Sequence, residues 1–187
     1  LNEPQVTAHR GFAYGMYAPG FEDRGKFFAA THHQNLAQGR ALARLRQINP
    51  SWRLGTVFNL SVPIAETPSQ DNLKAAATYD LMWNRNFLDP LFKGEYPSET
   101  LPDLESVLQS GDLAEIKHKI DFLGLNYYCR SFCRWDENHP LKVARAPAPK
   151  NQPRTCLDWE IYPAAFKEML LRLRDEYGNP EVYISEN

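Results

Sequence analysis

Two glutamates near opposite ends of the chain have the clearest potential for chemistry. Glu3 stands in Asn2-Glu3-Pro4, and Glu186 directly follows an apolar run over 181–185. Glycosidic bond cleavage needs two carboxyl groups, because one protonates the departing oxygen and the other attacks the anomeric carbon or activates water. Position alone does not establish such a pair, since a glutamate after a strand is more often a helix-start or surface residue.

Other polar side chains also stand at the ends of predicted strands. Asn126 and Tyr128 end the apolar run 120–128, and Asn59 lies near the end of the run 54–60. The carboxyl ends of parallel strands are where ligands and catalytic groups gather in α/β folds. Tyr127 competes with Tyr128 for any role in the site. Asn59 could contact the leaving group of a substrate, but we interpret it as a residue that caps a strand-to-loop turn.

Apolar periodicity predicts the elements that would position these side chains. Steps of three and four residues indicate helices over 34–48, 71–88, 112–119 and 166–177. We expect Asp71 to cap the second of these helices and Asp89-Pro90 to end it. Short runs rich in β-branched and aromatic residues indicate strands over 54–60, 120–128 and 181–185. The proline-rich segment 130–155 is predicted to be a long loop.

Helices and strands that alternate in this way require parallel strands joined by helical crossovers. The predicted class is therefore α/β, with one domain or part of one. The chain has 187 residues, and its ends at Leu1 and Asn187 both look cut, so we expect flanking sequence on both sides.

Several motifs along the chain occur in the order typical of one enzyme family. They are Asn2-Glu3-Pro4, 14–20, His32-His33-Gln34-Asn35, 87–97, 121–128, 159–163 and 183–187. Together these motifs resemble glycoside hydrolase family 1, the β-glucosidase family, over nearly the whole chain. The resemblance implies a partial (β/α)8 TIM barrel, in which residues 1–187 form a single segment of the catalytic domain. This segment runs from the end of strand 4 to the end of strand 7, without the N- and C-terminal parts of the barrel.

The resemblance also assigns roles to the candidate residues. It implies a retaining mechanism with Glu3 as the acid/base and Glu186 as the nucleophile, whose carboxyl groups would lie about 5 to 5.5 Å apart. Asn2 resembles the donor to the sugar 2-hydroxyl, and Tyr128 the tyrosine that orients the nucleophile. Asn126 resembles a supporting polar residue of the pocket floor.

The expected substrate is a β-glucoside or cello-oligosaccharide with a terminal non-reducing β-D-glucosyl residue, and no cofactor is expected. Gln5 and Tyr17 replace a tryptophan and a histidine that are common in the family, which leaves the leaving-group preference open. One alternative is a 6-phospho-β-glucosidase or galactosidase of the same family. Another is a non-catalytic carbohydrate-binding fragment. We expect the isolated chain to be inactive and poorly folded, because its outer strands would expose unpaired edges.

Composition narrows the remaining functions. The net charge of −2 argues against nucleic-acid binding, and no apolar run approaches the roughly 18 residues that span a membrane. Cys129, Cys133 and Cys156 are expected to be reduced thiols, and the expected location is cytoplasmic. We expect no metal site, and we interpret His32-His33 as the opening of a helix. The sequence gives no expectation for the oligomeric state.

The aromatic residues outside these motifs have simpler interpretations. Trp52, Trp83 and Trp159 are expected to pack against the fold, whereas Trp135, in the predicted long loop, is a candidate for a sugar subsite. Glu160 and Tyr162 are interpreted as scaffold residues around the last helix.

Overall fold

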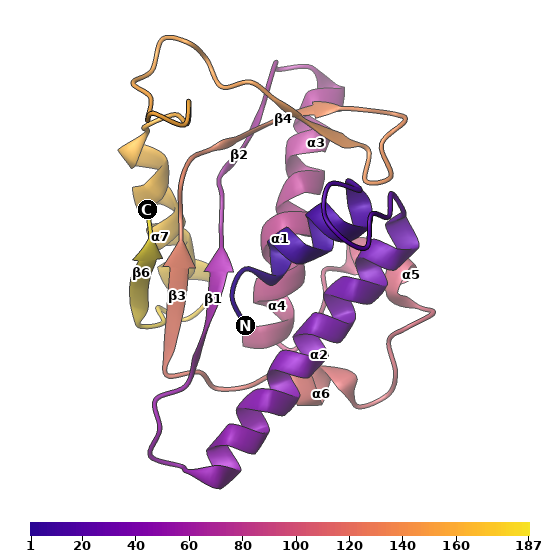
Figure 1. Ribbon diagram of the computed structural model, residues 1–187, viewed down its shortest axis with the longest axis vertical. Helices are drawn as coiled ribbons and strands as arrows, with labels where there is room; N and C mark the ends of the chain where they lie inside the picture. Colours follow the sequence, from indigo (N-terminus) through magenta and orange to yellow (C-terminus); the bar gives the residue numbers. More distant parts are fainter.

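The computed structural model describes all residues 1–187 and contains two three-stranded sheets flanked by helices (Figure 1). The helices are α1 Pro4–Ala8, α2 Arg24–Ile48, α3 Gln70–Asp80, α4 Asn86–Phe92, α5 Leu101–Leu104, α6 Asp112–Ile116 and α7 Pro163–Glu176. The strands are β1 Gly55–Asn59, β2 Pro63–Ala65, β3 Phe122–Asn126, β4 Ser131–Trp135, β5 Val143–Ala146 and β6 Val182–Glu186. Short π-helical turns cover His9–Ala13 and Leu81–Arg85, and a 3-10 turn covers Ser98–Thr100.

The first sheet carries the predicted strand-end residues. Its order is β1-β3-β6, and both pairings are parallel. A parallel bridge between Asn2 and Val57 places the start of the chain beside β1, so residues 1–3 extend the sheet by one more neighbour. The structure therefore confirms the α/β class with parallel strands, and all the strand ends point to the same rim (Figure 1).

The core lies between this sheet and the helices that cover one of its faces. Alternate side chains of β1 and β3, including Phe58 and Leu125, are fully buried in one cluster with residues of α2, α4 and α7. This alternation follows from the two-residue period of a strand, which leaves Val57 and Asn59 for the opposite face. The site lies on that opposite face, whereas the apolar packing lies on the face that the helices cover.

Helix α2 is longer than the predicted 34–48, because Asp23 starts it ten residues earlier. The Asp23 carboxylate accepts a hydrogen bond from the Lys26 backbone at 2.8 Å, which caps the first turn. Gly39 lets α6 cross closely, since a Cβ at this position would lie 2.1 Å from the Glu115 carbonyl oxygen. His32 and His33 lie inside α2 and do not open it, so that prediction was wrong.

The predicted helix 71–88 is two helices with a π-helical turn between them. Ser69 caps α3, and not Asp71, because the Ser69 hydroxyl accepts from the Asn72 backbone at 3.2 Å. Helix α4 passes through Pro90 instead of ending there. Proline cannot donate to the carbonyl four residues earlier, and the Asn35 side chain donates to that carbonyl, of Asn86, at 2.8 Å. A tertiary hydrogen bond therefore lets the helix continue.

The segment 130–155 is not the unstructured loop that its prolines indicated. It contains β4 and β5, which pair antiparallel, and β4 also pairs parallel with β2. The prolines lie outside both strands, so they interrupt no ladder. This second sheet packs on α3 through a small cluster of Ala75, Tyr79, Cys133 and Val143.

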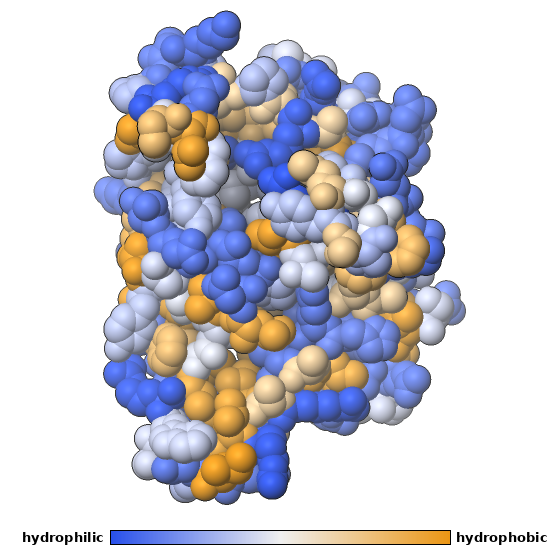
Figure 2. All heavy atoms as spheres, viewed as in Figure 1, coloured by the Kyte–Doolittle hydropathy of each residue, from blue (hydrophilic) through white to orange (hydrophobic).

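The outer strand of the first sheet has an open edge. Tyr183 and Ile184 of β6 are 48% and 46% exposed, which is high for apolar strand residues. Figure 2 shows a mixed surface on the viewed face, with hydrophobic patches gathered in its lower half. None of the helices has the length and apolarity that a bilayer crossing requires.

Candidate active site

Glu3 and Glu186 meet at the rim of the parallel sheet through one shared side chain. The Asn126 amide nitrogen donates to Glu3 Oε1 at 2.8 Å and to Glu186 Oε1 at 2.9 Å. Two oxygens bound to one nitrogen lie within about twice that distance of each other, which is shorter than the roughly 6.5–9.5 Å between the carboxyl groups of inverting glycosidases. The residues from the two ends of the chain therefore form one carboxylate pair.

A β-bulge in β6 turns the Glu186 side chain toward Asn126 and Glu3. Leu125 pairs with Ile184 and Asn126 pairs with Glu186, so Ser185 is an extra residue between the two pairs. Without this extra residue, the two-residue strand period would turn the Glu186 side chain toward the helices. The Ser185 hydroxyl donates to Asn126 Oδ1 at 2.7 Å. This bond fixes the amide oxygen of Asn126 on Ser185, so the amide nitrogen faces the two glutamates. Ionised carboxylates only accept hydrogen bonds, and this nitrogen supplies a donor to each of them.

Tyr128, and not Tyr127, reaches the carboxylates. The Tyr128 hydroxyl donates to Glu186 Oε2, so both oxygens of Glu186 accept a hydrogen bond. Burial, the bond to Glu186 and the negative charge of Glu3 raise the pKa of Tyr128 above its usual value, which keeps the hydroxyl protonated as a donor. Tyr127 instead points into the core, where its ring stacks on Phe166 with centroids 4.9 Å apart.

Asn59 contacts Glu3 directly, so its interpretation as a turn cap was wrong. Its amide nitrogen donates to Glu3 Oε1 at 3.0 Å. Glu3 Oε1 thus accepts from two amides, while Glu3 Oε2 accepts from neither of them. Glu3 itself has a left-handed backbone with φ of 46°. Non-glycine residues adopt this conformation at a cost of about 1–3 kcal/mol, and such strain is concentrated at functional sites.

Asn2 lies beside the carboxylate pair but outside its hydrogen-bond network. Its backbone forms the bridge to Val57, and its side chain is exposed. The structure records no hydrogen bond between the Asn2 amide and any other candidate residue. Four of the five predicted site residues are therefore joined directly, and Asn2 is placed next to them.

A cavity of about 300 Å³ adjoins Glu3 on the side of α1 and the second sheet. We call it the Glu3 cavity. Its lining residues are Glu3, Val6, Arg10, Tyr17, Asn59, Ser61, Tyr79, Trp83, Tyr128, Cys129, Ser131, Arg145 and Trp159. Trp159 was predicted to pack, but it is 41% exposed and meets the Tyr128 ring edge-on at 5.1 Å. Trp135 is not among the lining residues and packs beside the small cluster on α3, so its predicted subsite role finds no support.

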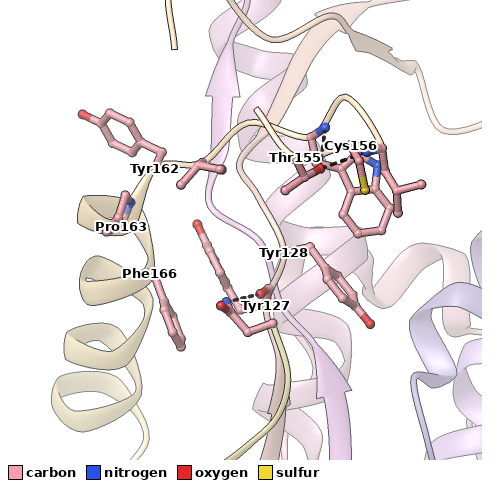
Figure 3. A pocket seen from close by; sticks show the side chains of 11 residues that line it. Tyr127, Tyr128, Thr155, Cys156, Tyr162, Pro163 and Phe166 are labelled. Carbon is pink, nitrogen blue, oxygen red and sulfur yellow. Dashed lines mark hydrogen bonds between the residues drawn. The ribbon is translucent and has the colours of Figure 1, made fainter. Parts of the chain in front are cut away.

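A second cavity of about 520 Å³ lies on the other side of Tyr128, against α7. Figure 3 shows Tyr127 and Phe166 side by side on one flank and Tyr128 directed the other way. The Asn187 side chain donates to the Tyr127 carbonyl at 2.8 Å and so closes part of this space. Neither Glu3 nor Glu186 lines it.

The histidine pair is part of the scaffold. His32 is buried and bonds Tyr96 at 3.1 Å and Asp112 at 3.0 Å. His33 lies on the exposed side of α2 and contacts the Ala29 carbonyl. No group of three or more His, Cys, Asp or Glu residues in the chain has a metal-binding arrangement. Cys129, Cys133 and Cys156 are unpaired thiols.

Comparison with known proteins identifies the family. The model of the family described as "Glycosyl hydrolase family 1" matches residues 1–187. The chain belongs to this family. It is 35% identical to β-glucosidase A of Thermotoga maritima and 30% identical to a 6-phospho-β-glucosidase of Bacillus subtilis, and each alignment covers the whole chain. A crystal structure of a psychrophilic β-glucosidase from Micrococcus antarcticus superposes with a TM-score of 0.87 at 34% identity, also over the whole chain.

The chain spans less than half of each of these family 1 proteins. It covers 42% of the Thermotoga maritima enzyme, 43% of the Bacillus subtilis enzyme and 45% of the Micrococcus antarcticus chain. The predicted fold class is thereby confirmed: this is a partial family 1 (β/α)8 barrel. Its four parallel neighbours, residues 1–3, β1, β3 and β6, run from the end of barrel strand 4 to the end of strand 7.

Proposed function

We propose that the full-length protein containing this chain is a retaining β-glucosidase, and that residues 1–187 are a single segment of its catalytic domain. Glu3 is its acid/base and Glu186 is its nucleophile. The observation that supports this proposal most strongly is the Asn126 amide, which binds both carboxylates at once. A pair held this closely suits direct attack on the sugar and leaves no room for a water molecule between nucleophile and substrate.

In the first step, a Glu186 oxygen forms a bond to the anomeric carbon. The bond from that carbon to the leaving oxygen breaks, and Glu3 transfers its proton to this oxygen. The two amide bonds on Glu3 Oε1 support this role, because they leave Oε2 as the oxygen that carries the proton. Asn126 and Tyr128 hold both oxygens of Glu186 and so orient it before substrate arrives.

In the second step, a water molecule attacks the anomeric carbon of the glycosyl-enzyme. Glu3 takes the proton from this water, and the bond between the sugar and Glu186 breaks. The Tyr128 hydroxyl then hydrogen-bonds the carboxylate that is released. Asn2 donates to the sugar 2-hydroxyl during both steps, a role supported by its exposed side chain beside Glu3.

The proposed substrates are β-glucosides and cello-oligosaccharides. A 6-phospho-β-glucosidase is the second candidate, because a relative of that name aligns over the whole chain at 30% identity. The two differ in the glycone, which lies on the nucleophile side of the pair. Turnover of a 4-nitrophenyl β-glucoside and of its 6-phosphate by the full-length protein separates them.

Chemical rescue tests the two roles in the full-length protein. In Glu186→Ala, we expect activity on a neutral aryl β-glucoside to fall by on the order of 10⁴-fold or more. Azide then fills the space left by the carboxylate and gives the α-glucosyl azide. In Glu3→Ala, azide attacks the glycosyl-enzyme instead and gives the β-glucosyl azide. The same azide anomer from both variants, or no loss of activity, contradicts the assignment.

Two further features belong to the proposal. The isolated chain is inactive and poorly folded, which the exposed edge of β6 supports, because this strand has no neighbour on its outer side. The three unpaired thiols favour a reducing compartment such as the cytoplasm. The substrate is the only partner that we propose.

A further inference from the structure

The Glu3 cavity contains two guanidinium groups that have no carboxylate partner. Most arginines of the chain form ion pairs, such as Arg130 with Glu160 at 2.6 Å and Arg172 with Asp80 at 2.5 Å. Those without a carboxylate within 4.0 Å are Arg10, Arg44, Arg134 and Arg145. Of these four, only Arg10 and Arg145 line the cavity. Two of the four unpaired arginines therefore lie at the cavity beside the acid/base.

The second sheet places Arg145 over this cavity. Arg145 of β5 lies opposite Cys133 of β4, and paired residues of an antiparallel ladder share a face. Cys133 packs against α3, so Arg145 projects toward Tyr79 and Trp83, with which it lines the cavity. Arg145 is an exposed residue as a whole, while its guanidinium lies in a partly desolvated place beside Tyr79 and Cys129 in the cavity lining.

Arg10 reaches the same space from the other end of the sequence. It lies in the π-helical turn after α1 and lines the Glu3 cavity together with Arg145. Its guanidinium contacts only uncharged groups, namely the Met16 sulfur at 3.2 Å and the Tyr17 ring at 5.7 Å. Both contacts leave its charge without compensation.

The charge of the cavity wall is positive when catalysis begins. Glu3 is the only acidic residue among the lining residues. As the proposed acid it is protonated before bond cleavage, so the wall then carries two positive charges and no negative one. A cavity with low-dielectric walls focuses such charge on whatever enters it.

Aromatic rings give the cavity its shape. Tyr79 and Trp83 are stacked with an interplanar angle of 13°, and Trp159 stands at the Tyr128 side. A volume of about 300 Å³ is at the low end for small-molecule sites, which fits a single flat ring better than a chain of sugars. Guanidinium groups bind carboxylates through paired, charge-assisted hydrogen bonds.

Among β-glucosides, we propose that the preferred leaving group is an aromatic ring bearing a carboxylate, and that Arg145 and Arg10, which line the same cavity, bind this carboxylate. The proposal rests on the proposed glycosidase function and specifies its leaving-group site. Arg145 contributes to specificity and takes no part in bond cleavage, which stays with Glu3 and Glu186.

The test compares two leaving groups of nearly the same shape on the full-length protein. The substrates are 4-carboxyphenyl β-glucoside and its neutral counterpart, 4-carbamoylphenyl β-glucoside, and the readout is the ratio of their kcat/KM values. We expect the acid to be preferred by about 10- to 100-fold, the range for a hydrogen-bonded charge. In Arg145→Gln the ratio falls to about 1, and Arg145→Lys keeps an intermediate ratio.

Arg134→Gln is the matched control, because Arg134 lies on the neighbouring strand β4, is exposed and also lacks a carboxylate partner. This variant keeps the wild-type ratio. Both substrates are measured on the same preparation, so partial unfolding of a variant does not change the ratio. A wild-type ratio of 1 or less, or an unchanged ratio in Arg145→Gln, overturns the proposal.

A second measurement separates this proposal from the proposed function. Turnover of 4-nitrophenyl β-glucoside, which carries no carboxylate, reports the glycosidase activity alone. If this substrate is cleaved without any preference for the acid, only the leaving-group proposal fails. If it is not cleaved, calorimetric titration with 4-hydroxybenzoate tests the leaving-group site by itself. Binding that is lost in Arg145→Gln supports the leaving-group proposal, and no binding to the unmodified protein refutes this proposal.

Discussion

The carboxylate pair and the Glu3 cavity share Glu3 but are built in opposite ways. At the pair, Asn126, Asn59, Ser185 and Tyr128 supply hydrogen bonds from within the chain. In the cavity wall, Arg10 and Arg145 lack carboxylate partners, and the buried Trp83 indole N–H has no acceptor. Donors already aimed at developing charge need no reorganisation during reaction. The chain therefore completes its reaction centre internally and leaves the adjoining wall to be completed by a ligand.

Removal of the Asn126 side chain should cause the largest loss of activity, because it disrupts the internally completed reaction centre. Asn126→Ala takes away the donor that both carboxylates share, so we expect kcat/KM of the full-length protein on an aryl β-glucoside to fall by about 10²- to 10³-fold. Asn151→Ala, in an exposed loop, is the control and should have no effect. A loss of less than about fivefold in Asn126→Ala would mean that the amide does not organise the pair.

Tyr128→Phe should have a smaller effect, because Glu186 keeps its bond to Asn126. We expect kcat to fall by about 10- to 100-fold through loss of one hydrogen bond to a charged group. The raised pKa keeps Tyr128 protonated at about pH 10, so its ionisation should not limit the activity of the unmodified enzyme up to that pH. Tyr127→Phe removes a buried hydroxyl that has no partner and serves as the control. Equal losses in the two variants would contradict this role.

The smallest predicted effect concerns acid stability next to the Glu3 cavity. Burial lowers the pKa of His9 to about 3, and the charges of His139 and Arg10 act in the same direction, against the backbone bond to Met82. The unfolded chain binds a proton below its pKa of about 6.5 while the folded chain does not, so stability falls as the pH decreases through this value. Between about pH 7 and pH 5.5, this amounts to about 1 kcal/mol.

Denaturant unfolding of the full-length protein at these two pH values measures the His9 contribution. His9→Phe should reduce the stability lost on acidification, because the phenyl ring cannot bind a proton. His33→Phe is the control, since His33 is exposed on α2 and should leave the loss unchanged. An undiminished loss in His9→Phe would show that other groups cause the acid sensitivity.

The sequence could predict the carboxylate pair because strand-end position and the family-like motifs around Glu3 and Glu186 are both local signals. Glu3 follows the bridge residue Asn2 and Glu186 ends β6, and the ends of parallel strands meet at one rim wherever the strands lie in the sequence. The structure brings the two together as predicted, and their catalytic roles remain proposals. The alternation of helices and strands was likewise sufficient to predict the parallel sheet.

The features that the sequence did not reveal depend on contacts between distant segments. The passage of α4 through Pro90 requires the Asn35 side chain, which lies on another helix. Asn59 looks like an ordinary turn residue until Glu3 is placed beside it. The Ser185 bulge has no sequence signature, because only the register with β3 shows which residue is extra. Arg145 lay in a segment that prolines marked as a loop.

The loop that carries Trp159 is fastened on both sides of the indole. Glu160, 1% exposed, accepts two hydrogen bonds from Arg130, at 2.8 and 2.6 Å, and the Arg130 guanidinium also lies 3.7 Å from the centre of the Tyr162 ring. This clamp joins the residue after Trp159 to the residue directly before β4. Upstream of the clamp, the stretch from Pro147 to Gln152 belongs to no helix or strand. The Arg154 guanidinium donates both to the Ala148 and Pro149 carbonyls in that stretch and to Asp158, the residue before Trp159. A change in the stretch therefore reaches the indole at the mouth of the cavity through Arg154.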